Sequence, residues 1–560
     1  MRKLITLSLA TTSLLMGGTS AVPTISDVVR EITPIVGVTP KSEPLIDVGG
    51  VQKYAPAMEE DKSGKTTLVT GFKLTGAKHI REAALQPLIA SYTNKELTFG
   101  QLQEVASVIT KAYRTQGYFV ARAYLPVQTM QGGKVEISII EGNFGAFNLN
   151  NSSLVKDSVI QGMLDSVKGK DIVSTHTLER AMLIINDTAG SKVTQADVMP
   201  GKATGTSDFA IKTEATPAYD GYIVGDNYGS RYTGSNRLMG GLNLNSPTGN
   251  GDKLSLLGMI SNGSDLKYGR AVYSIPLMSN GLRGELSYAN THYSLTDRYA
   301  ALDAYGTART LEASVTYPVI RTRHESLNLT SSFALKALQD HQNGIISSDK
   351  SAKVFTLGVN HTKEMTLLGL PTKTNETLSL TSGNLTFKDT TSQATDAAGA
   401  NTQGRYNKIS GYVGGSVAFT QVTSLSANLL FQKALGHKNL DGTEDFILGG
   451  SNGIKVYPTS ELSAEDGIML NTELSQALPT MGVINQKVGL FHDIGTVRMA
   501  DASKVTTFQS HTLQDVGMGY YASYQGFFVK AQVARVVGGN QVTSETNYRT
   551  KFLAQLGWSF

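Results

Sequence analysis

The chain has 560 residues, which is too long for one ordinary domain. It contains no Cys, which excludes a disulfide framework and any Cys-ligated zinc or iron–sulfur site. Charged residues make up only 17%, and 57 Gly, 23 Tyr and 18 Phe favour turn-rich β structure over a cytosolic enzyme. The formal net charge of +4 gives no indication of a nucleic-acid partner, and the mean hydropathy of −0.12 excludes a bundle of membrane helices.

Residues 1–21 have the pattern of a cleaved secretory signal peptide. Arg2 and Lys3 precede the apolar run Leu4–Met16, and small residues then predict cleavage directly after Ala21. A transmembrane anchor is the alternative, but the run is shorter than the about 20 residues that a spanning helix requires. Because lipid leaves no backbone polar group unpaired, an exported chain without a later apolar helix can enter a membrane again only as a β-barrel.

Residues 22–67 are predicted to contain one short helix followed by a polar linker. The helix has an apolar face formed by Ile25, Val28, Val29 and Ile32, and Pro34 follows its end.

Residues 68–142 have the order strand, helix, helix, strand, strand. The second helix is predicted to begin with a capping box of Thr98 and Gln101. Three further elements are expected at Arg81–Tyr92, Phe119–Pro126 and Lys134–Ile140. Residues 143–216 repeat this order at nearly the same length, which indicates a duplicated small module of helices and strands.

Residues 217–560 lose the helical spacing and alternate apolar with polar side chains between Gly-, Asn-, Asp- and Ser-containing turns. This alternation fits a wall with lipid outside and water inside, and about sixteen such segments predict a 16-stranded transmembrane β-barrel. A soluble β-sandwich is the alternative, because its strands also alternate apolar with polar side chains. The last strand favours the barrel, because its apolar face ends in Trp558 and the terminal Phe560, as in strands that outer-membrane assembly machinery recognises.

Motifs for enzyme chemistry are not recognisable. Gly64-Lys65-Thr66 resembles the end of a phosphate loop, but Glu59 stands where its first Gly is required. The 9 His residues have no spacing typical of helical metal ligands. We therefore expect no enzyme, no catalytic residue, no cofactor and no metal site.

The motifs of the two modules resemble the POTRA domains of two-partner secretion transporters. In residues 68–142 they are Tyr113-x3-Gly117-Tyr118, Pro126-x-Gln128, Gly133 and Ile140-Glu141-Gly142. In residues 143–216 they are Leu178-x-Arg180, Asn186-Asp187-x-x-Gly190, Pro200-Gly201 and Gly205-Thr206-Ser207-Asp208. The family usually has Pro where this chain has Ala189.

Two barrel motifs are the most specific. The loop motif Ile454-Lys455-Val456-Tyr457 lies where the superfamily carries Val-Arg-Gly-Tyr, and Phe491-x-Asp493-x-Gly495 matches its Phe-x-Asp-x-Gly strand motif. On these motifs the mature chain resembles the TpsB transporters of the Omp85 superfamily, of the haemolysin secretion/activation type. In that family the loop Arg pairs with the strand Asp in the lumen. Lys455 is a point charge rather than a planar fork, so we expect a weaker pair, worth about 1 kcal/mol in a wet lumen.

The resemblance implies a transporter in the outer membrane of a Gram-negative bacterium, with both POTRA modules in the periplasm. The modules would bind an unfolded TpsA-type exoprotein by its N-terminal secretion domain through strand addition, and the barrel would conduct it outward without ATP. Candidate contacts for the exoprotein are Phe119, Val120, Ala121, Tyr124 and Leu125. The short helix that ends at Ile32 is the candidate plug of the pore. The other expected partners are outer-membrane lipid and the barrel assembly machinery.

Two alternatives remain at this stage. A barrel-insertion factor of the same superfamily would usually carry more than two POTRA modules. A passive porin would need no periplasmic modules.

Overall fold

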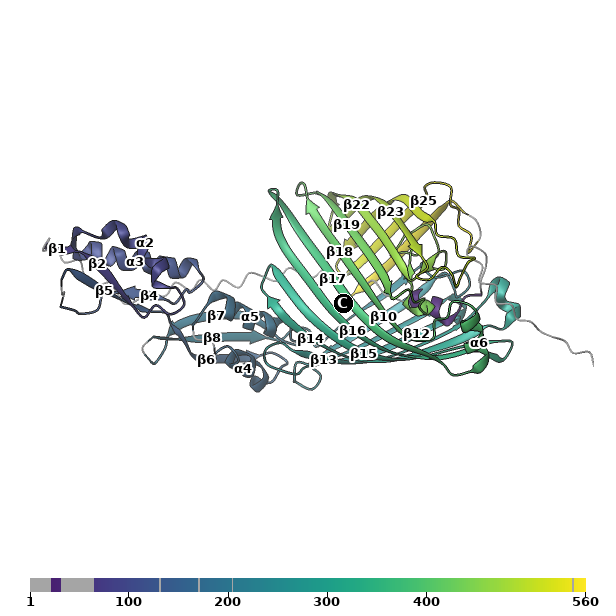
Figure 1. The fold of residues 1–560 in the computed structure, drawn as a ribbon, viewed down its shortest axis with the longest axis horizontal. Helices are drawn as coiled ribbons and strands as arrows, with labels where there is room; N and C mark the ends of the chain where they lie inside the picture. The colour runs from purple at the N-terminus through teal and green to yellow at the C-terminus, as the bar shows by residue number, and fades with distance from the viewer. Residues whose placement is uncertain (1–21, 32–64, 130–131, 170–171, 204, 546–547) are drawn as a thin grey trace, which may run out of the picture.

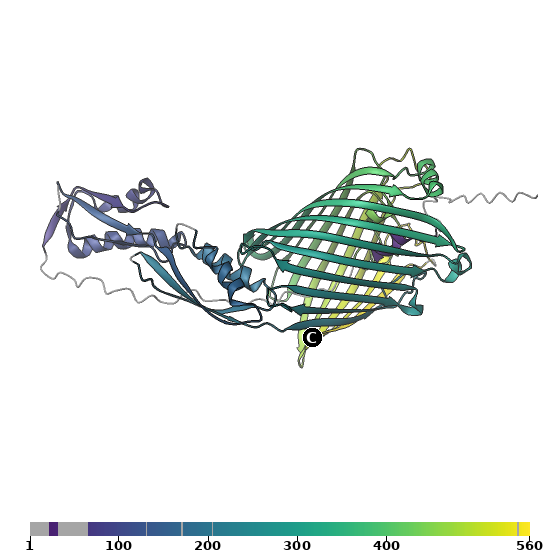
Figure 2. The same ribbon diagram turned by 90° about the horizontal axis from the view of Figure 1, so that it is seen from below.

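The computed structural model describes residues 22–31, 65–129, 132–169, 172–203, 205–545 and 548–560. The predicted signal peptide and Ile32 lie outside these residues. Two small modules lie in a row and lead to one end of a large β-barrel (Figures 1 and 2). No helix in the described ranges is long and apolar enough to cross a membrane.

The first module is a three-stranded sheet covered by two helices. Its elements are β1 (Thr66–Val69), β2 (Gly71–Thr75), α2 (Glu82–Ile89), η1 (Ala90–Tyr92), β3 (Lys95–Thr98), α3 (Phe99–Thr115), β4 (Arg122–Tyr124) and β5 (Lys134–Ile140). The sheet order is β2-β5-β4, and β1 pairs with β3 in a separate ladder. The predicted capping box is confirmed, because the Thr98 hydroxyl accepts from the Gln101 N–H and the Gln101 side chain accepts from the Thr98 N–H.

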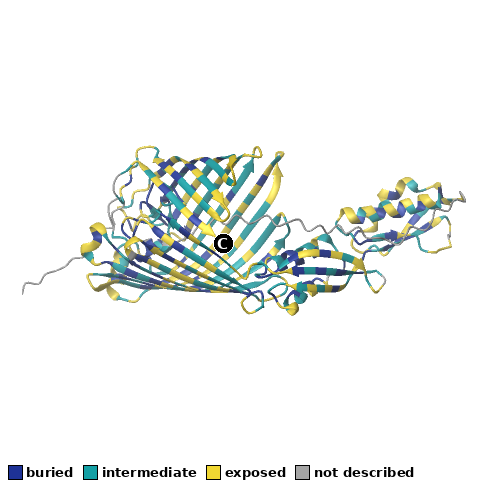
Figure 3. Ribbon diagram, turned by 180° about the vertical axis from the view of Figure 1, so that it is seen from behind, coloured by how far each residue is buried: buried dark blue, intermediate teal, exposed yellow. Residues whose placement is uncertain are grey.

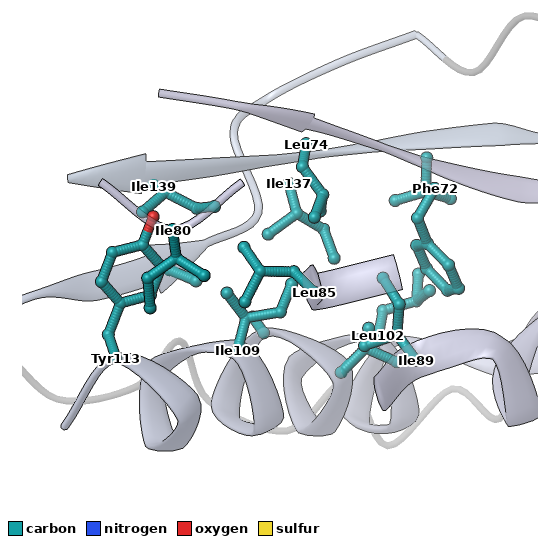
Figure 4. Packing of buried hydrophobic residues seen from close by; sticks show 14 of the residues in the cluster. Phe72, Leu74, Ile80, Leu85, Ile89, Leu102, Ile109, Tyr113, Ile137 and Ile139 are labelled. Atoms are coloured by element: carbon teal, nitrogen blue, oxygen red, sulfur yellow. The ribbon is translucent and has the colours of Figure 1, made fainter. Parts of the chain in front are cut away.

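The core of the first module lies between the sheet and α3. Ile109 and Tyr113 of α3, with Leu85 of α2, point toward Ile137 and Ile139 of β5 (Figure 4). The strand expected at residues 119–126 is only three residues long. A turn in which the Ala121 N–H donates to the Tyr118 carbonyl precedes it, which delays the start of the strand.

The second module has the same sheet topology as the first. Its elements are β6 (Asn143–Ser152), α4 (Asp157–Asp165), α5 (Thr175–Asn186), β7 (Lys192–Pro200) and β8 (Thr206–Glu214). Their order is β6-β8-β7, with β6 parallel and β7 antiparallel to β8. In the first module β2 is likewise parallel and β4 antiparallel to β5, as expected for a duplicated unit.

The remaining chain forms a closed antiparallel barrel of sixteen strands, which confirms the predicted fold class. The strands are β9 (Tyr219–Asp226), β10 (Arg237–Asn245), β11 (Lys253–Ser261), β12 (Leu266–Pro276), β13 (Arg283–Ser294), β14 (Tyr305–Arg321), β15 (Glu325–Gln342), β16 (Ile345–Leu367), β17 (Leu370–Phe387), β18 (Gly404–Ala418), β19 (Thr423–Leu435), β22 (Asp466–Met481), β23 (Ile484–Arg498), β24 (Thr512–Tyr524), β25 (Phe527–Val536) and β26 (Thr550–Ser559). The loops carry η2 (Asn262–Ser264), η3 (Asp297–Leu302), α6 (Thr390–Ala398), η4 (Gly442–Glu444), β20 (Phe446–Ile447) and β21 (Ser463–Ala464). Pairing of β26 with β9 closes the wall.

The outer face of the barrel is apolar and the inner face is polar or covered. In β15 the alternate residues Leu329, Phe333 and Leu335 are exposed on the outside. Lys336 and Asp340 lie on the opposite face of the same strand and contact segments inside the lumen. Exposed and less exposed residues alternate along the strands in this way (Figure 3).

The second module is docked on the barrel rim by a motif that the sequence had marked. Asp187 accepts two hydrogen bonds, each 2.7 Å long, from the guanidinium of Arg321 at the end of β14. Gly190 has φ of +89°, and a Cβ there would lie 2.8 Å from the Cβ of Ser246. Only Gly permits this close approach between module and barrel.

Candidate functional site: the closed lumen and the module surfaces

The loop between β19 and β22 folds into the barrel lumen. The Ile454 N–H donates to the Leu448 carbonyl at 2.7 Å, which closes a tight turn within the loop. Val456 and Tyr457 are fully buried, and the Tyr457 hydroxyl donates to the Asn540 carbonyl at 2.6 Å. The loop motif is therefore packed against the wall rather than suspended in solvent.

The structure brings the two barrel motifs together. Lys455 Nζ lies 2.5 Å from Asp493 Oδ2 and 4.4 Å from the centre of the Phe491 ring. The other Asp493 oxygen accepts from the Asn471 amide at 2.7 Å. A Cβ at Gly495 would lie 2.7 Å from Leu448 of the loop, which explains the Gly of the strand motif. The strand motif thus positions the loop in three ways: Asp493 pairs with Lys455, the Phe491 ring packs against the same Lys, and Gly495 leaves room for Leu448.

Asp515 is a further loop contact that sequence reasoning missed. It lies directly opposite Asp493 in the β23–β24 ladder, and its Oδ2 accepts from the Val456 N–H at 2.7 Å. Its Oδ1 has no hydrogen-bond partner among the described residues. Two carboxyl groups therefore face one Lys, where a forked Arg would have donors for both.

The Lys455–Asp493 pair is not in a wet lumen, which corrects the expected energy. The Asp493 side chain is 0% exposed and that of Lys455 is 12% exposed. Removing one partner of a buried pair leaves an unpaired buried charge, at a cost of about 3–5 kcal/mol rather than the surface value of about 1 kcal/mol.

The helix α1 (Ile25–Glu31) lies inside the barrel, toward the end away from the modules (Figures 1 and 2). Ile25 and Val28 are buried, and Val29 is half-buried. They pack against residues of the barrel wall that include Tyr293 and Leu338. Three of the four candidate plug residues are therefore in the lumen, and the fourth is Ile32.

Polar residues from three parts of the barrel hold the start of α1. The Ile25 N–H donates to Asp340 Oδ1 at 2.8 Å, and the Tyr293 hydroxyl donates to the same oxygen at 2.7 Å. Ser26 lies between Lys350 and Asp441, which also form a buried ion pair with each other. A carboxylate next to the first helical N–H stabilises a helix, and Asp340 supplies it from β15.

The candidate exoprotein contacts on the first module divide into buried and exposed groups. Val120 and Ala121 are buried, so in this conformation their side chains are not accessible to an exoprotein. Val120 packs in the core of the second module, where it joins the two modules. Phe119 and Leu125 are partly buried, and only Tyr124 has an exposed side chain.

The edge strand β4 is poorly suited to strand addition. It is three residues long, and the Ala123 N–H donates to the Thr110 hydroxyl of α3 at 2.9 Å. Gln128 mimics a further strand residue, because its side-chain amide both donates to and accepts from the Glu136 backbone of β5. The longer edges of the modules are β6 and β7, which each pair on one side only, with β8.

Glu141 explains the Ile140-Glu141-Gly142 motif and carries a testable pH dependence. Burial raises the pKa of this carboxyl, but hydrogen bonds from His79, Lys78 and Tyr113 outweigh burial and leave the pKa below its usual range. A carboxyl with a lowered pKa stabilises the folded state above its unfolded pKa of about 4.3, and the stabilisation is lost as the pH falls through the folded pKa.

We expect Glu141→Ala to destabilise the first module by about 1–3 kcal/mol at pH 7, because the buried Tyr113 hydroxyl and three donors of Lys78 and His79 lose their acceptor. Urea unfolding of the two-module segment should show this difference, and the difference should narrow at acidic pH. Glu136→Ala on the exposed face of β5 is the control, with a small effect at both pH values. Equal unfolding of the parent and the Glu141 variant at pH 7 would contradict the assigned role.

Comparison with known proteins identifies the family. Residues 205–519 match the family described as haemolysin secretion/activation protein ShlB/FhaC/HecB, and residues 67–142 match the POTRA domain of ShlB type. This chain belongs to the ShlB/FhaC/HecB family. It is a non-enzymatic outer-membrane transporter of two-partner secretion, as the sequence motifs predicted, with its POTRA modules in the periplasm.

Relatives resemble this chain in sequence, and solved structures resemble it in fold, over most of its length. The heme/hemopexin transporter protein HuxB of Haemophilus influenzae strain 86-028NP is 26% identical over 464 residues, which cover 81% of each chain. The structure of CdiB from Escherichia coli matches with a TM-score of 0.74 at 19% identity and covers 91% of this chain and 93% of that one. BamA from Haemophilus ducreyi, lacking POTRA domains 1–3, matches with a TM-score of 0.50 at 13% identity over 88% of this chain and 100% of that one.

Proposed function

We propose that this family member transports one unfolded exoprotein from the periplasm to the cell surface through its own barrel, without ATP. The modules bind the exoprotein, and the lumen conducts it after α1 and the 448–457 loop have moved out of their places in the lumen. The observation that carries this proposal is that two segments other than the wall, α1 and the 448–457 loop, lie in the lumen and contact its wall while all sixteen strands stay paired.

The plug role of α1 is supported by its size and its contacts. A helix of seven residues is not stable alone in water, so α1 is expected to unfold when it leaves Asp340 and the apolar wall. Release and unfolding of the plug then occur together. An extended exoprotein segment that entered the lumen would compete for the same space.

Capture by the modules is supported by their exposed edges. The nine-residue strand β7 and the ten-residue strand β6 offer backbone groups to an extended peptide, which gives affinity with little dependence on sequence. The exposed ring of Tyr124 adds an apolar contact on the first module. Folding of the exoprotein outside the cell supplies the driving force and makes the transport one-way.

Reconstitution in proteoliposomes tests transport without ATP. The probe is a TpsA-type exoprotein that cells secrete only when this chain is co-expressed, unfolded in urea and diluted to the module side of the vesicles with no nucleotide. Appearance of protease-protected exoprotein in the lumen of the vesicles is expected. Protection only after nucleotide is added would contradict the proposal, and insertion of a co-added barrel protein would favour an assembly factor.

Removing residues 22–67 is expected to raise the ion conductance of the barrel in planar bilayers, because a vacated lumen holds more water and ions. Asp340→Ala should raise the frequency of open events in the intact chain, since it removes the acceptor at the start of α1. Asp349→Ala, on the other face of the neighbouring strand β16, serves as the control. Equal conductance of the intact and truncated proteins would show that α1 is not a plug.

A further inference from the structure

Three successive turns at the periplasmic rim of the barrel end in exposed apolar side chains. They are Leu367 and Leu368 between β16 and β17, Phe419 and Val422 between β18 and β19, and Met481 and Val483 between β22 and β23. We call these six residues the rim tips. Leu368 is 93% exposed and has φ of +52°, a left-handed conformation that a bulky side chain disfavours and that Asn or Gly adopts easily. Both its exposure and its backbone therefore disfavour Leu at this position.

A polar layer separates the rim tips from the lipid-facing band. On the outer face of β16 the exposed residues Phe355 and Leu357 are followed by His361. His361 lies 3.0 Å from Glu325 of β15 and 2.9 Å from Glu376 of β17, which places charge between the lipid band and the tips. An ion-pair layer of this kind marks the edge of the hydrocarbon, where charged side chains become tolerable.

The same polar layer continues around the barrel as hydrogen-bonded amides. The Thr423 hydroxyl donates to Gln476 at 2.6 Å, and the Tyr520 hydroxyl donates to Gln486 at 2.7 Å. The rim tips lie on the periplasmic side of these polar contacts, away from the lipid-facing band.

The rim is asymmetric. Its other half, at the turns from β10 to β15, is docked to the second module through contacts such as Asp187–Arg321 and Gly190–Ser246. The half that carries the rim tips faces the same periplasmic space, since the strand ends and the modules lie at one end of the barrel (Figure 1). The rim tips thus lie on the half of the pore mouth to which no module is docked, and the β12–β13 turn on the docked half also exposes Leu277 and Met278.

The area of the rim tips is too small for a stable contact with a second copy of the chain. Stable interfaces bury about 800 Å² on each partner, whereas six side chains on three separate turns present only a few hundred Å². Such a surface suits a weak contact with a chain that moves past it. An unfolded polypeptide presents exposed apolar side chains for this kind of contact.

We propose that the rim tips form a transient docking surface for apolar segments of the unfolded exoprotein as it passes from the modules into the lumen. The proposal rests on the transport function proposed above. The surface acts after capture by the modules and before entry into the pore, and its small area lets each segment leave quickly.

Because the chain contains no Cys, single-Cys variants give an uncomplicated test. Leu368→Cys, Val422→Cys and Met481→Cys are labelled with a photoactivatable thiol reagent in cells that co-express a TpsA-type exoprotein whose secretion depends on this chain. Each is expected to crosslink to the exoprotein. Leu357→Cys in the lipid-facing band is the control and is expected to crosslink to lipid only. Crosslinks from the tips to lipid alone, or to a second copy of the chain, would overturn the proposal.

A functional variant complements the crosslinks. A variant that combines four substitutions in the rim tips should secrete several-fold less exoprotein at equal amounts of heat-modifiable barrel. The substitutions are Leu367→Ser, Leu368→Asn, Val422→Ser and Met481→Ser. Asn at position 368 relieves the left-handed φ, so the turn is preserved. Ile345→Ser with Ile346→Ser, exposed apolar residues at the β15–β16 turn on the opposite end of the barrel, is the matched control and should secrete as the parent does. Equal secretion by the tip variant and the parent would overturn this inference alone, whereas absence of secretion by the parent would overturn the transport function.

Discussion

Deletion of residues 68–142 is expected to reduce secretion of the exoprotein to background while the barrel still inserts in the outer membrane. The barrel keeps all sixteen strands and the terminal residues Trp558 and Phe560, so its assembly does not require the first module. The exoprotein, in contrast, loses its contact with the first module. This module lies farthest from the membrane and is the part of the transporter that the exoprotein meets first. Secreted exoprotein and heat-modifiable mobility of the barrel are measured in the same cells.

Point variants separate capture from support of the neighbouring module. Val120 fills the core of the second module, so the deletion also weakens that core. Val120→Ala tests this support, and Tyr124→Ser removes an exposed ring without changing either core. We expect Tyr124→Ser to lower secretion while the modules stay folded. Undiminished secretion by the deletion would refute capture by the first module.

Lys455→Ala and Asp493→Ala are each expected to impair secretion strongly, and the double variant should be little worse than either. Breaking the buried pair leaves one unpaired charge, at a cost of about 3–5 kcal/mol, and the loop loses its position against Phe491. Because the barrel wall is unchanged, its insertion should remain intact. A double-mutant cycle on the secreted amount, at equal barrel quantity, measures the coupling.

Lys455→Arg sharpens this test. A guanidinium has donors for Asp493 and for the free oxygen of Asp515, so this variant should keep or improve secretion. Asp515→Ala should remove any gain, since it takes away the second acceptor and the partner of the Val456 N–H. If the fold-losses in secretion of the two single variants multiply in the double variant, Lys455 and Asp493 act independently. The contact between them then has no role in transport.

The sequence by itself determined the elements whose signal is local. Alternation in segments such as 327–335 marked barrel strands, because one face meets lipid and the other meets the lumen. The Thr98–Gln101 capping box marked the start of α3, because a cap is formed within four residues. The spacing of Ile25 and Val28 marked the buried face of α1. The resemblance of two motifs to the family predicted that Lys455 and Asp493 meet in one site.

Tertiary structure decided what depends on residues far apart in the chain. Burial of the Lys455–Asp493 pair, and the second carboxylate of Asp515, follow from strand pairing and loop packing that no local pattern contains. Asp340 looks like any lumen-facing polar residue until α1, 315 positions away in the sequence, lies against it. Val120 is buried because the second module covers it, and no local pattern around this residue shows that contact. Burial is a property of the assembled surfaces, so it is fixed only when the modules and the barrel meet.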